Sequence, residues 1–232
     1  MLLTAPGKTG VKNVVAGVNH DEITDEDRIL AAASCTTNAI VPVLRAVQDE
    51  FGIAHGHLET VHAYTNDQNL IDNFHGKNRR GRAAPLNMVI TETGASSAVV
   101  KLMPELAGKL TGNAIRVPTP NVSMAICNLT LARETTVEEL NEYLRYMALH
   151  SHLQRQIDFT TSPEVVSSDF VGNRHAGIVD AKATIAMPSS STARPRSSTP
   201  IGRFSTAGTT TSTATAARWC ASSRSSPASA IR

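Results

Sequence analysis

Apolar and polar positions recur along the chain with periods that predict both helices and strands. Over residues 37–51 the apolar side chains return every three or four positions, and a glycine follows, so we expect a helix there. A second helix is expected over 94–106, broken late by Pro104. A third follows Thr135 and Thr136, each of which has a glutamate three residues on, the spacing of a capping box.

Other segments are rich in branched apolar residues and predict strands instead. We expect strands over 11–18, 58–65, 113–117, 122–133 and 175–186. Strands and helices that are mixed along one chain in this way favour an α/β or α+β fold.

Composition narrows the class of protein. The chain has 232 residues and 41% hydrophobic residues, enough to bury a core in one large domain or two small ones. It contains no run of eighteen apolar residues and no secretory signal, and we expect a cytoplasmic protein. Its three cysteines are too few and too scattered for a disulfide scaffold, and no C-x-x-C motif or other metal-ligand spacing is present.

The net charge of +2 is unevenly distributed. Residues 187–232 hold six arginines and no lysine, aspartate or glutamate, which leaves 16 basic against 20 acidic residues in 1–186. The mildly acidic body excludes the electrostatic footprint of a nucleic-acid or membrane partner. Of the 46 residues in 187–232, 20 are serine or threonine, a composition typical of a disordered segment.

Cys35 is the first candidate for chemistry. It stands between Ser34 and Thr36 where the first predicted helix begins. Unpaired backbone N–H groups and the positive end of the helix dipole lie at such a position, and they favour a thiolate. The alternative is a small buried cysteine near a helix cap, and the spacing alone leaves the two about equal.

His62 is the candidate base. It lies in a predicted strand between Val61 and Ala63, 27 residues after Cys35. A histidine in an apolar strand is more often a packed core residue, and only the fold can bring it to the cysteine.

Three further features attract anions or resemble a phosphate site. Thr93-Gly94 opens a predicted helix and Arg116 ends a predicted strand. Both features suggest a small anionic substrate. The alternative is that they are an ordinary helix N-cap and a surface arginine. The run 7–9 (GKT) resembles the end of a phosphate loop but lacks its first glycine, so we expect an ordinary turn. The basic cluster in 77–82 is expected in a solvated or intersubunit loop.

The run 33–38 (ASCTTN) resembles the active-site signature of phosphorylating glyceraldehyde-3-phosphate dehydrogenases of bacterial type. Segments that follow in the family's order are TVHAYT, RGRAA, TGA, PELAGKL, IRVPTPNVS and VVSSDF. The resemblance covers about residues 2–185, and the ordered set is far more specific than any one motif.

This resemblance implies roles for individual residues. Cys35 would attack the aldehyde of glyceraldehyde 3-phosphate to give a thiohemiacetal, with His62 as the base. Hydride transfer to NAD would leave a thioester, which inorganic phosphate would cleave. Thr65 and Arg116 match positions that hold the substrate phosphate. The positions that match the site of the attacking phosphate are Ser34, Thr36, Thr93 and Gly94.

The resemblance also implies an organisation. We expect an α+β catalytic domain over 34–186, with a mixed, mostly antiparallel sheet and helices on one face. Residues 1–33 would be the remnant of an NAD-binding Rossmann domain, in which Thr4 matches a position near the cofactor. Residues 64–87 match a loop that lines the cofactor pocket and a subunit interface, which implies a homotetramer of the full-length protein.

The sequence departs from the family at both ends. It has no G-x-G-x-x-G turn, so we expect this chain alone to bind NAD poorly. The choice between NAD and NADP stays open, because the residue that selects the ribose is expected to lie outside this chain. Residues 207–217, read one base earlier, can spell the Trp-Tyr-Asp-Asn-Glu segment of the family. We therefore expect 187–232 to be a disordered frameshift product, and the alternative is a genuine disordered tail. We also expect the chain to be weakly active or inactive.

Two other functions stay open. Erythrose-4-phosphate dehydrogenase shares most of these motifs. A non-catalytic interaction protein built on the catalytic domain is the alternative from another class, and the reactivity of Cys35 separates it from an enzyme.

Overall fold

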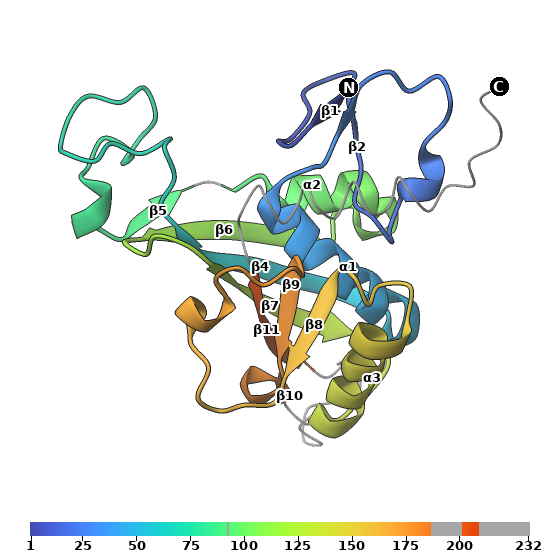
Figure 1. The fold of residues 1–232 in the computed structure, drawn as a ribbon. Helices are drawn as coiled ribbons and strands as arrows, with labels where there is room; N and C mark the ends of the chain where they lie inside the picture. The colour runs from blue at the N-terminus through green and yellow to red at the C-terminus, as the bar shows by residue number, and fades with distance from the viewer. Residues whose placement is uncertain (92, 187–200, 209–232) are drawn as a thin grey trace.

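The computed structural model describes residues 1–91, 93–186 and 201–208 (Figure 1). Its α-helices are α1 (Cys35–Phe51), α2 (Ala95–Leu102) and α3 (Val137–His150). The large sheet contains β4 (Ile53–Ala63), β5 (Val89–Thr91), β6 (Leu110–Val117), β7 (Ser123–Leu131), β8 (Ile157–Thr160), β9 (Gly177–Asp180), β10 (Ile185–Ala186) and β11 (Ile201–Gly208). Short 3-10 turns span His20–Glu22, Ala84–Leu86, Pro104–Leu106, Ser167–Phe170 and Ala181–Ala183.

The large sheet is mixed and mostly antiparallel. Its strands run in the order β5-β6-β4-β7-β11-β9-β8, and β10 pairs with β11. Within this sheet, the described pairs β4–β6 and β8–β9 are parallel and the other described pairs are antiparallel. The predicted fold class is therefore confirmed.

The three helices cover one face of this sheet (Figure 1). Helix α1 lies between α2 and α3 and packs on β7, β9 and β11, while α2 contacts β6 and α3 contacts β8. Apolar side chains from α1, such as Leu44 and Val47, meet Leu58 of β4 and Leu129 of β7 in one buried cluster. This single core fixes the start of α1 over one end of the strands.

A close approach of backbone to backbone holds the first turns of α1 against the sheet. A Cβ atom on Gly177 of β9 would lie only 2.5 Å from the carbonyl oxygen of Ala39 in α1. Glycine is therefore required here, because any larger residue would push the helix away from β9. The contact lies one turn after Cys35, so it sets the height of the cysteine over the sheet.

A small parallel sheet precedes the large one. It contains β1 (Leu2–Leu3), β2 (Lys12–Asn13) and β3 (Leu30–Ala31) in the order β1-β3-β2. The expected strand over 11–18 is wrong beyond Asn13. The chain turns there because the Asn19 side chain accepts from Val15 N at 2.8 Å, and Gly17 adopts a positive φ of 81°.

Most other predicted elements are confirmed with shifted ends. The first helix starts two residues earlier than expected, at Cys35, and the second stops at Leu102 before the turn that begins with Pro104. The expected strand over 175–186 is interrupted, because Asp180 accepts hydrogen bonds from Lys182 N and Ala183 N and folds that stretch into a 3-10 turn.

Within the segment 187–232, which was expected to be disordered, the described residues Ile201–Gly208 form β11. This strand pairs with β7 over its whole length and with β9 through Thr206 and Ala207. Both neighbours would otherwise present unpaired N–H and C=O groups, which is the physical reason for a strand between them. Residues 187–200 and 209–232, which include most of the segment behind the frameshift hypothesis, lie outside the described residues.

Candidate active site

Cys35 is the first residue of α1, and the local hydrogen bonds fix it there. The side chain of Ser34 caps the helix by accepting from Thr37 N at 3.1 Å. One turn further, Asn38 Nδ2 donates to Ala32 O at 2.7 Å and to Ser34 O at 2.9 Å. Ala33, just before this turn, has a positive φ of 55°, a conformation that non-glycine residues rarely adopt. The thiol is thus held at the positive end of a seventeen-residue helix.

The fold brings His62 to this thiol. His62 is the second-last residue of β4, and its Nε2 lies 3.7 Å from Cys35 Sγ. The cysteine is half-buried and the histidine is 6% exposed. The predicted pairing of these two side chains across 27 residues is therefore present in the geometry.

His62 is uncharged at neutral pH. Burial is the main reason that its pKa falls from 6.5 to about 4, and the positive charge of Arg116 lowers it further. The carbonyl of Ala63, 2.6 Å from His62 Nδ1, works in the opposite direction. The histidine therefore meets the thiol as a neutral imidazole, whose effect depends on which nitrogen carries the proton.

Arg116 contacts the far side of this imidazole. Because β4 and β6 are parallel and in register, His62 and Arg116 stand directly opposite each other. Arg116 Nη1 lies 2.6 Å from His62 Nδ1 and donates to Ala63 O at 3.3 Å. Arg116 Nε is buried without a hydrogen-bond partner among the described residues. Burial lowers the pKa of the guanidinium.

These groups open into a cavity with a volume of about 960 Å³. Its wall includes Cys35, His62, Arg116 and five other predicted site residues: Ser34, Thr36, Thr65, Thr93 and Gly94. One side is formed by residues 6–13, which include the predicted turn, closed by a bond from Val11 N to Lys8 O of 3.0 Å. Thr4, the predicted cofactor residue, is exposed and is not among the lining residues.

The hydroxyl and amide groups around the thiol differ in whether they already have a hydrogen-bond partner within the protein. Ser34 Oγ is already engaged with Thr37 Oγ1 at 2.6 Å, and Thr93 Oγ1 accepts from Ala95 N at 3.1 Å. Thr36 Oγ1 lies 4.0 Å from Cys35 Sγ. The N-terminus of α2 follows Gly94, which is exposed. Two helix N-termini and the guanidinium groups of Arg80 and Arg116 therefore surround the cavity, a setting that favours anions.

Arg80 is a lining residue that sequence reasoning assigned only to a basic cluster. It pairs with Asp67 on the same loop and is one of the cationic side chains at the cavity. Its positive charge lowers the pKa of Arg116. The signal that could have placed it was its position in the RGRAA segment, close after the histidine strand.

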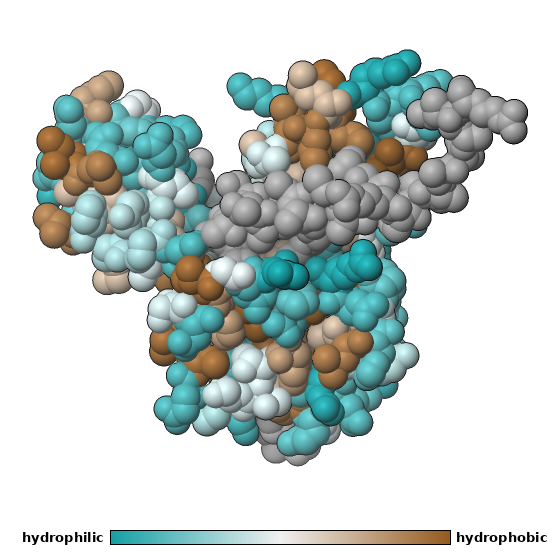
Figure 2. Space-filling model, in the orientation of Figure 1, coloured by the Kyte–Doolittle hydropathy of each residue, from teal (hydrophilic) through white to brown (hydrophobic). Residues whose placement is uncertain are grey.

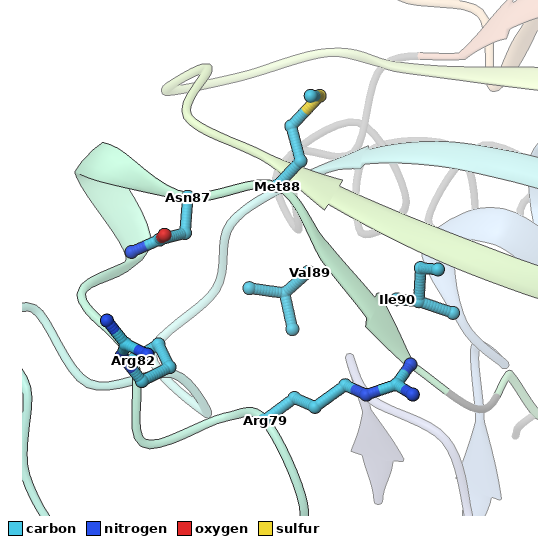
Figure 3. A pocket seen from close by; sticks show the side chains of 6 residues that line it. All are labelled: Arg79, Arg82, Asn87, Met88, Val89 and Ile90. Carbon is cyan, nitrogen blue, oxygen red and sulfur yellow. The ribbon is translucent and has the colours of Figure 1, made fainter.

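The loop over 64–88 projects from the body as a separate lobe (Figure 1). Apolar side chains gather on this lobe (Figure 2), and those that are exposed here and on the adjoining β5 are Leu70, Ile71, Phe74, Leu86, Met88 and Ile90. A second cavity of about 300 Å³ lies at its base, lined by Arg79, Arg82, Asn87, Met88, Val89 and Ile90 (Figure 3). None of these six residues lines the cavity around Cys35.

The described part of the chain contains neither a candidate metal site nor a candidate membrane-spanning helix. It contains no group of three or more histidine, cysteine or acidic side chains placed to hold a metal ion. None of its helices is long and apolar enough to cross a membrane.

Comparisons with known proteins point to one family. The family model described as "Glyceraldehyde 3-phosphate dehydrogenase, C-terminal domain" matches residues 34–195. A glyceraldehyde-3-phosphate dehydrogenase-like protein of Pseudomonas aeruginosa is 70% identical over 185 residues, which are 80% of this chain and 40% of that protein.

More distant relatives carry the family name itself. Glyceraldehyde-3-phosphate dehydrogenase of Zymomonas mobilis is 43% identical over 185 residues, 79% of this chain and 55% of the relative. The enzyme of that name from Pseudomonas aeruginosa PAO1 is 45% identical over 184 residues, 79% of this chain and 54% of the relative. The chain spans about half the length of the curated relatives that it matches.

Proposed function

This chain belongs to the glyceraldehyde-3-phosphate dehydrogenase family through the C-terminal domain of that family, and on this premise we propose that it carries the family's thiol chemistry. The proposed reaction is the oxidation of glyceraldehyde 3-phosphate, in the presence of inorganic phosphate, to 1,3-bisphosphoglycerate, a step of glycolysis. The observation that carries the proposal is the distance of 3.7 Å between His62 Nε2 and Cys35 Sγ, both of which line a cavity that favours anions.

In the first step Cys35 is the nucleophile. Its sulfur adds to the aldehyde carbon, the carbonyl oxygen becomes an alkoxide, and protonation of that oxygen gives a thiohemiacetal. His62 takes the thiol proton when its Nε2 lone pair is free, and the resulting imidazolium returns the proton to the oxygen. The backbone N–H groups at the start of α1 lie where they would support the negative charge.

Two sets of residues are proposed to bind the two phosphate groups. Thr65 and Arg116 would hold the phosphate of the substrate. The attacking phosphate would bind to Ser34, Thr36, Thr93 and Gly94. The placement of all six residues on one cavity wall around Cys35 supports this assignment.

Oxidation of the thiohemiacetal would need a hydride acceptor, for which the family implies NAD or NADP. The described residues do not fit a whole dinucleotide. They contain no glycine-rich turn between a strand and a helix to bind the diphosphate, and Thr4 is not among the residues that line the cavity. The steps assigned to this chain are therefore those that its own groups perform at the sulfur.

The second half-reaction needs only the thiol and phosphate. A phosphate oxygen attacks the thioester carbon, the C–S bond breaks, and the acyl phosphate leaves while Cys35 departs as a thiolate. His62 can then return a proton to the sulfur. This exchange is reversible, so an acyl phosphate added from outside should acylate Cys35.

We also propose the organisation that the family implies. Residues 1–33, with their small parallel sheet, would be the end of a dinucleotide-binding domain, and 34–186 the body of the catalytic domain. The exposed apolar side chains of the loop over 64–88 support a subunit interface, and a homotetramer is the proposed assembly.

The decisive experiment follows the second half-reaction in reverse with acetyl phosphate. We expect Cys35 to gain one acetyl group, which is released on addition of inorganic phosphate, with the modified peptide identified by mass spectrometry. Cys127 serves as an internal control, because burial raises the pKa of its thiol to about 12 and keeps it inert. Absence of acetylation on Cys35, or equal acetylation of Cys127, would contradict the proposal.

A coupled assay then tests the whole reaction. The chain, with glyceraldehyde 3-phosphate, NAD or NADP and inorganic phosphate, is monitored for the reduced nicotinamide. The Cys35→Ser variant is the matched control, because it removes the nucleophile and keeps a hydroxyl of similar size at the start of α1.

A further inference from the structure

We propose that the cavity continues past the thiol as a groove along α2, and that this groove binds an oligophosphate, a chain of two or three linked phosphate groups. One end of the groove is the proposed site of the attacking phosphate, and the other end holds the side chains of Lys8 and Lys101. The inference rests on the proposed function for the first end only. The second end is an anion site that the proposed reaction does not use.

One face of α2 forms a wall of the cavity. The α2 residues in the lining are Ala95, Ala98, Lys101 and Leu102, and Gly94, just before the helix, lines it as well. Positions that are three, four or seven residues apart lie on the same side of a helix. The cavity therefore follows α2 from its first turn to its last, and the rise of a helix makes the distance from Gly94 to Lys101 about 10 Å.

Residues 6–13, which lead into β2, form a second wall of the same cavity (Figure 1). The side chain of Asn13 fixes the start of this segment, because Gly7 N donates to Asn13 Oδ1 at 2.9 Å and Asn13 Nδ2 donates back to Gly7 O at 3.3 Å. The turn that follows carries Lys8. Each wall thus has its own hydrogen bonds, and each contributes one lysine to the cavity.

These two lysines differ from the other charged groups of the lining in having no partner. Lys12 pairs with Asp27 at 2.7 Å, and Arg80 pairs with Asp67. The side chains of Lys8 and Lys101 make no hydrogen bond or ion pair with any other residue that the structure describes. The only carboxylate among the described lining residues belongs to Glu22. An anion in this part of the cavity would therefore gain two positive charges without breaking an existing ion pair.

The shape of the groove favours a linear anion over a single phosphate group. A side chain on a helix leans toward the helix N-terminus, so we expect Lys101 to lean back along the groove toward Gly94. Ala98 lies between them and carries only a methyl group, so a ligand can lie against the helix. One phosphate group can reach only one end, whereas linked phosphate groups can contact the N-terminus of α2 and the two ammonium groups together.

The first experiment measures binding of inorganic phosphate and inorganic triphosphate by titration calorimetry at neutral pH and constant ionic strength. We expect triphosphate to bind at least about tenfold more tightly. Lys8→Gln and Lys101→Gln should each weaken triphosphate binding about fivefold, because solvent screens exposed charges, and leave phosphate binding unchanged. The matched control is Lys182→Gln, an exposed lysine that is not in the lining. Unchanged triphosphate binding in both cavity variants, or an equal loss in the control, would overturn the proposal.

A second variant tests the groove by shape and leaves every charge in place. Ala98→Leu fills the space between Gly94 and Lys101, and leucine is nearly as good a helix former as alanine. We expect triphosphate to bind this variant no more tightly than phosphate. Val100→Leu is the matched control, because it also enlarges a side chain of α2 but lies outside the lining. Tight triphosphate binding to Ala98→Leu would show that the ligand does not occupy the groove.

Two further measurements separate the possible outcomes. ATP as a probe identifies the source of the phosphate chain: binding as tight as that of triphosphate, and lost in the same variants, assigns the groove to a nucleotide, and weaker binding assigns it to a free oligophosphate. Failure of the proposed function has its own signature, because Cys35 is then not acetylated by acetyl phosphate while Lys8→Gln and Ala98→Leu still weaken triphosphate binding. Acetylation of Cys35 together with equal affinities for phosphate and triphosphate would overturn the groove and leave the proposed function standing.

Discussion

The site depends on a few side chains whose chemistry is set by burial. His62 touches three polar partners, the sulfur of Cys35, the carbonyl of Ala63 and the guanidinium of Arg116, in a place where water has little access. Burial penalises a charged imidazole, and the nearby cation adds to that penalty. A neutral histidine at the thiol is the result, and it has a cost that stability measurements can detect.

That cost predicts a dependence of stability on pH. The unfolded chain binds a proton on His62 below about pH 6.5, while the folded chain resists it down to about pH 4. The unfolded state therefore gains protons first, and the free energy of unfolding should fall as the pH is lowered through this window, by about 3 kcal/mol in total. Above pH 6.5 this contribution is fully present.

The measurement is urea unfolding at a series of pH values for the unchanged chain and for His62→Gln. Both chains contain the same carboxylates, whose own titration cancels in the comparison. We expect the unchanged chain to lose stability relative to the variant between pH 6.5 and pH 4. Parallel curves across this window would show that the folded chain protonates His62 readily.

At the scale of elements, the order of helices and strands was predictable, and the paths between them less so. The periodic residues of α1 and α3 and the Thr136 cap gave reliable signals, because one face of each helix must meet the core. The stretch 14–18 misled, because its branched side chains favour a strand while the Asn19 side chain and Gly17 close a turn.

The site was predictable to a similar extent. Cys35 and His62 came from motifs, but their approach depends on the register of β4 and the start of α1, which no local pattern encodes. The contact between Arg116 and His62 Nδ1 was also out of reach, because it follows from parallel pairing of β4 with β6 over 54 residues of separation. The fold supplies this contact, and the sequence supplies only the residue types.

The approach of α1 to β9 leads to an element-scale prediction. Gly177→Ala places a methyl group 2.5 Å from the backbone oxygen of Ala39, so the helix must shift. We expect a loss of about 1–3 kcal/mol in the free energy of unfolding, the usual cost of overpacking. Acetylation of Cys35 by acetyl phosphate should slow as the thiol moves from His62.

A matched glycine controls for the general effect of an added methyl group. A Cβ atom on Gly76 would meet nothing within 4 Å, so Gly76→Ala should leave both urea unfolding and the acetylation of Cys35 unchanged. Equal behaviour of the two variants would mean that the close packing of β9 on α1 does not position the thiol.

At the scale of the whole molecule, the lobe over 64–88 carries large apolar side chains that the rest of the chain does not bury. Its Phe74 is 90% exposed and Ile71 is 73% exposed, although burial of such side chains ordinarily stabilises a protein by about 1.5–3 kcal/mol each. Clustered apolar side chains on a projecting loop are typical of a surface that another subunit covers. The proposed homotetramer provides that cover with further copies of the same chain.

The double variant Ile71→Ser, Phe74→Ser tests this assignment. We expect it to shift the chain to smaller assemblies in sedimentation velocity, because it removes two apolar side chains from the proposed contact. The control is Leu149→Ser, which changes an apolar residue that is 49% exposed on α3, away from the lobe. An unchanged sedimentation profile for the double variant, or the same shift in the control, would show that the lobe is not part of the interface. Acetylation of Cys35 by acetyl phosphate should persist in the double variant, because the thiol, His62 and Arg116 all lie on the body of the same chain.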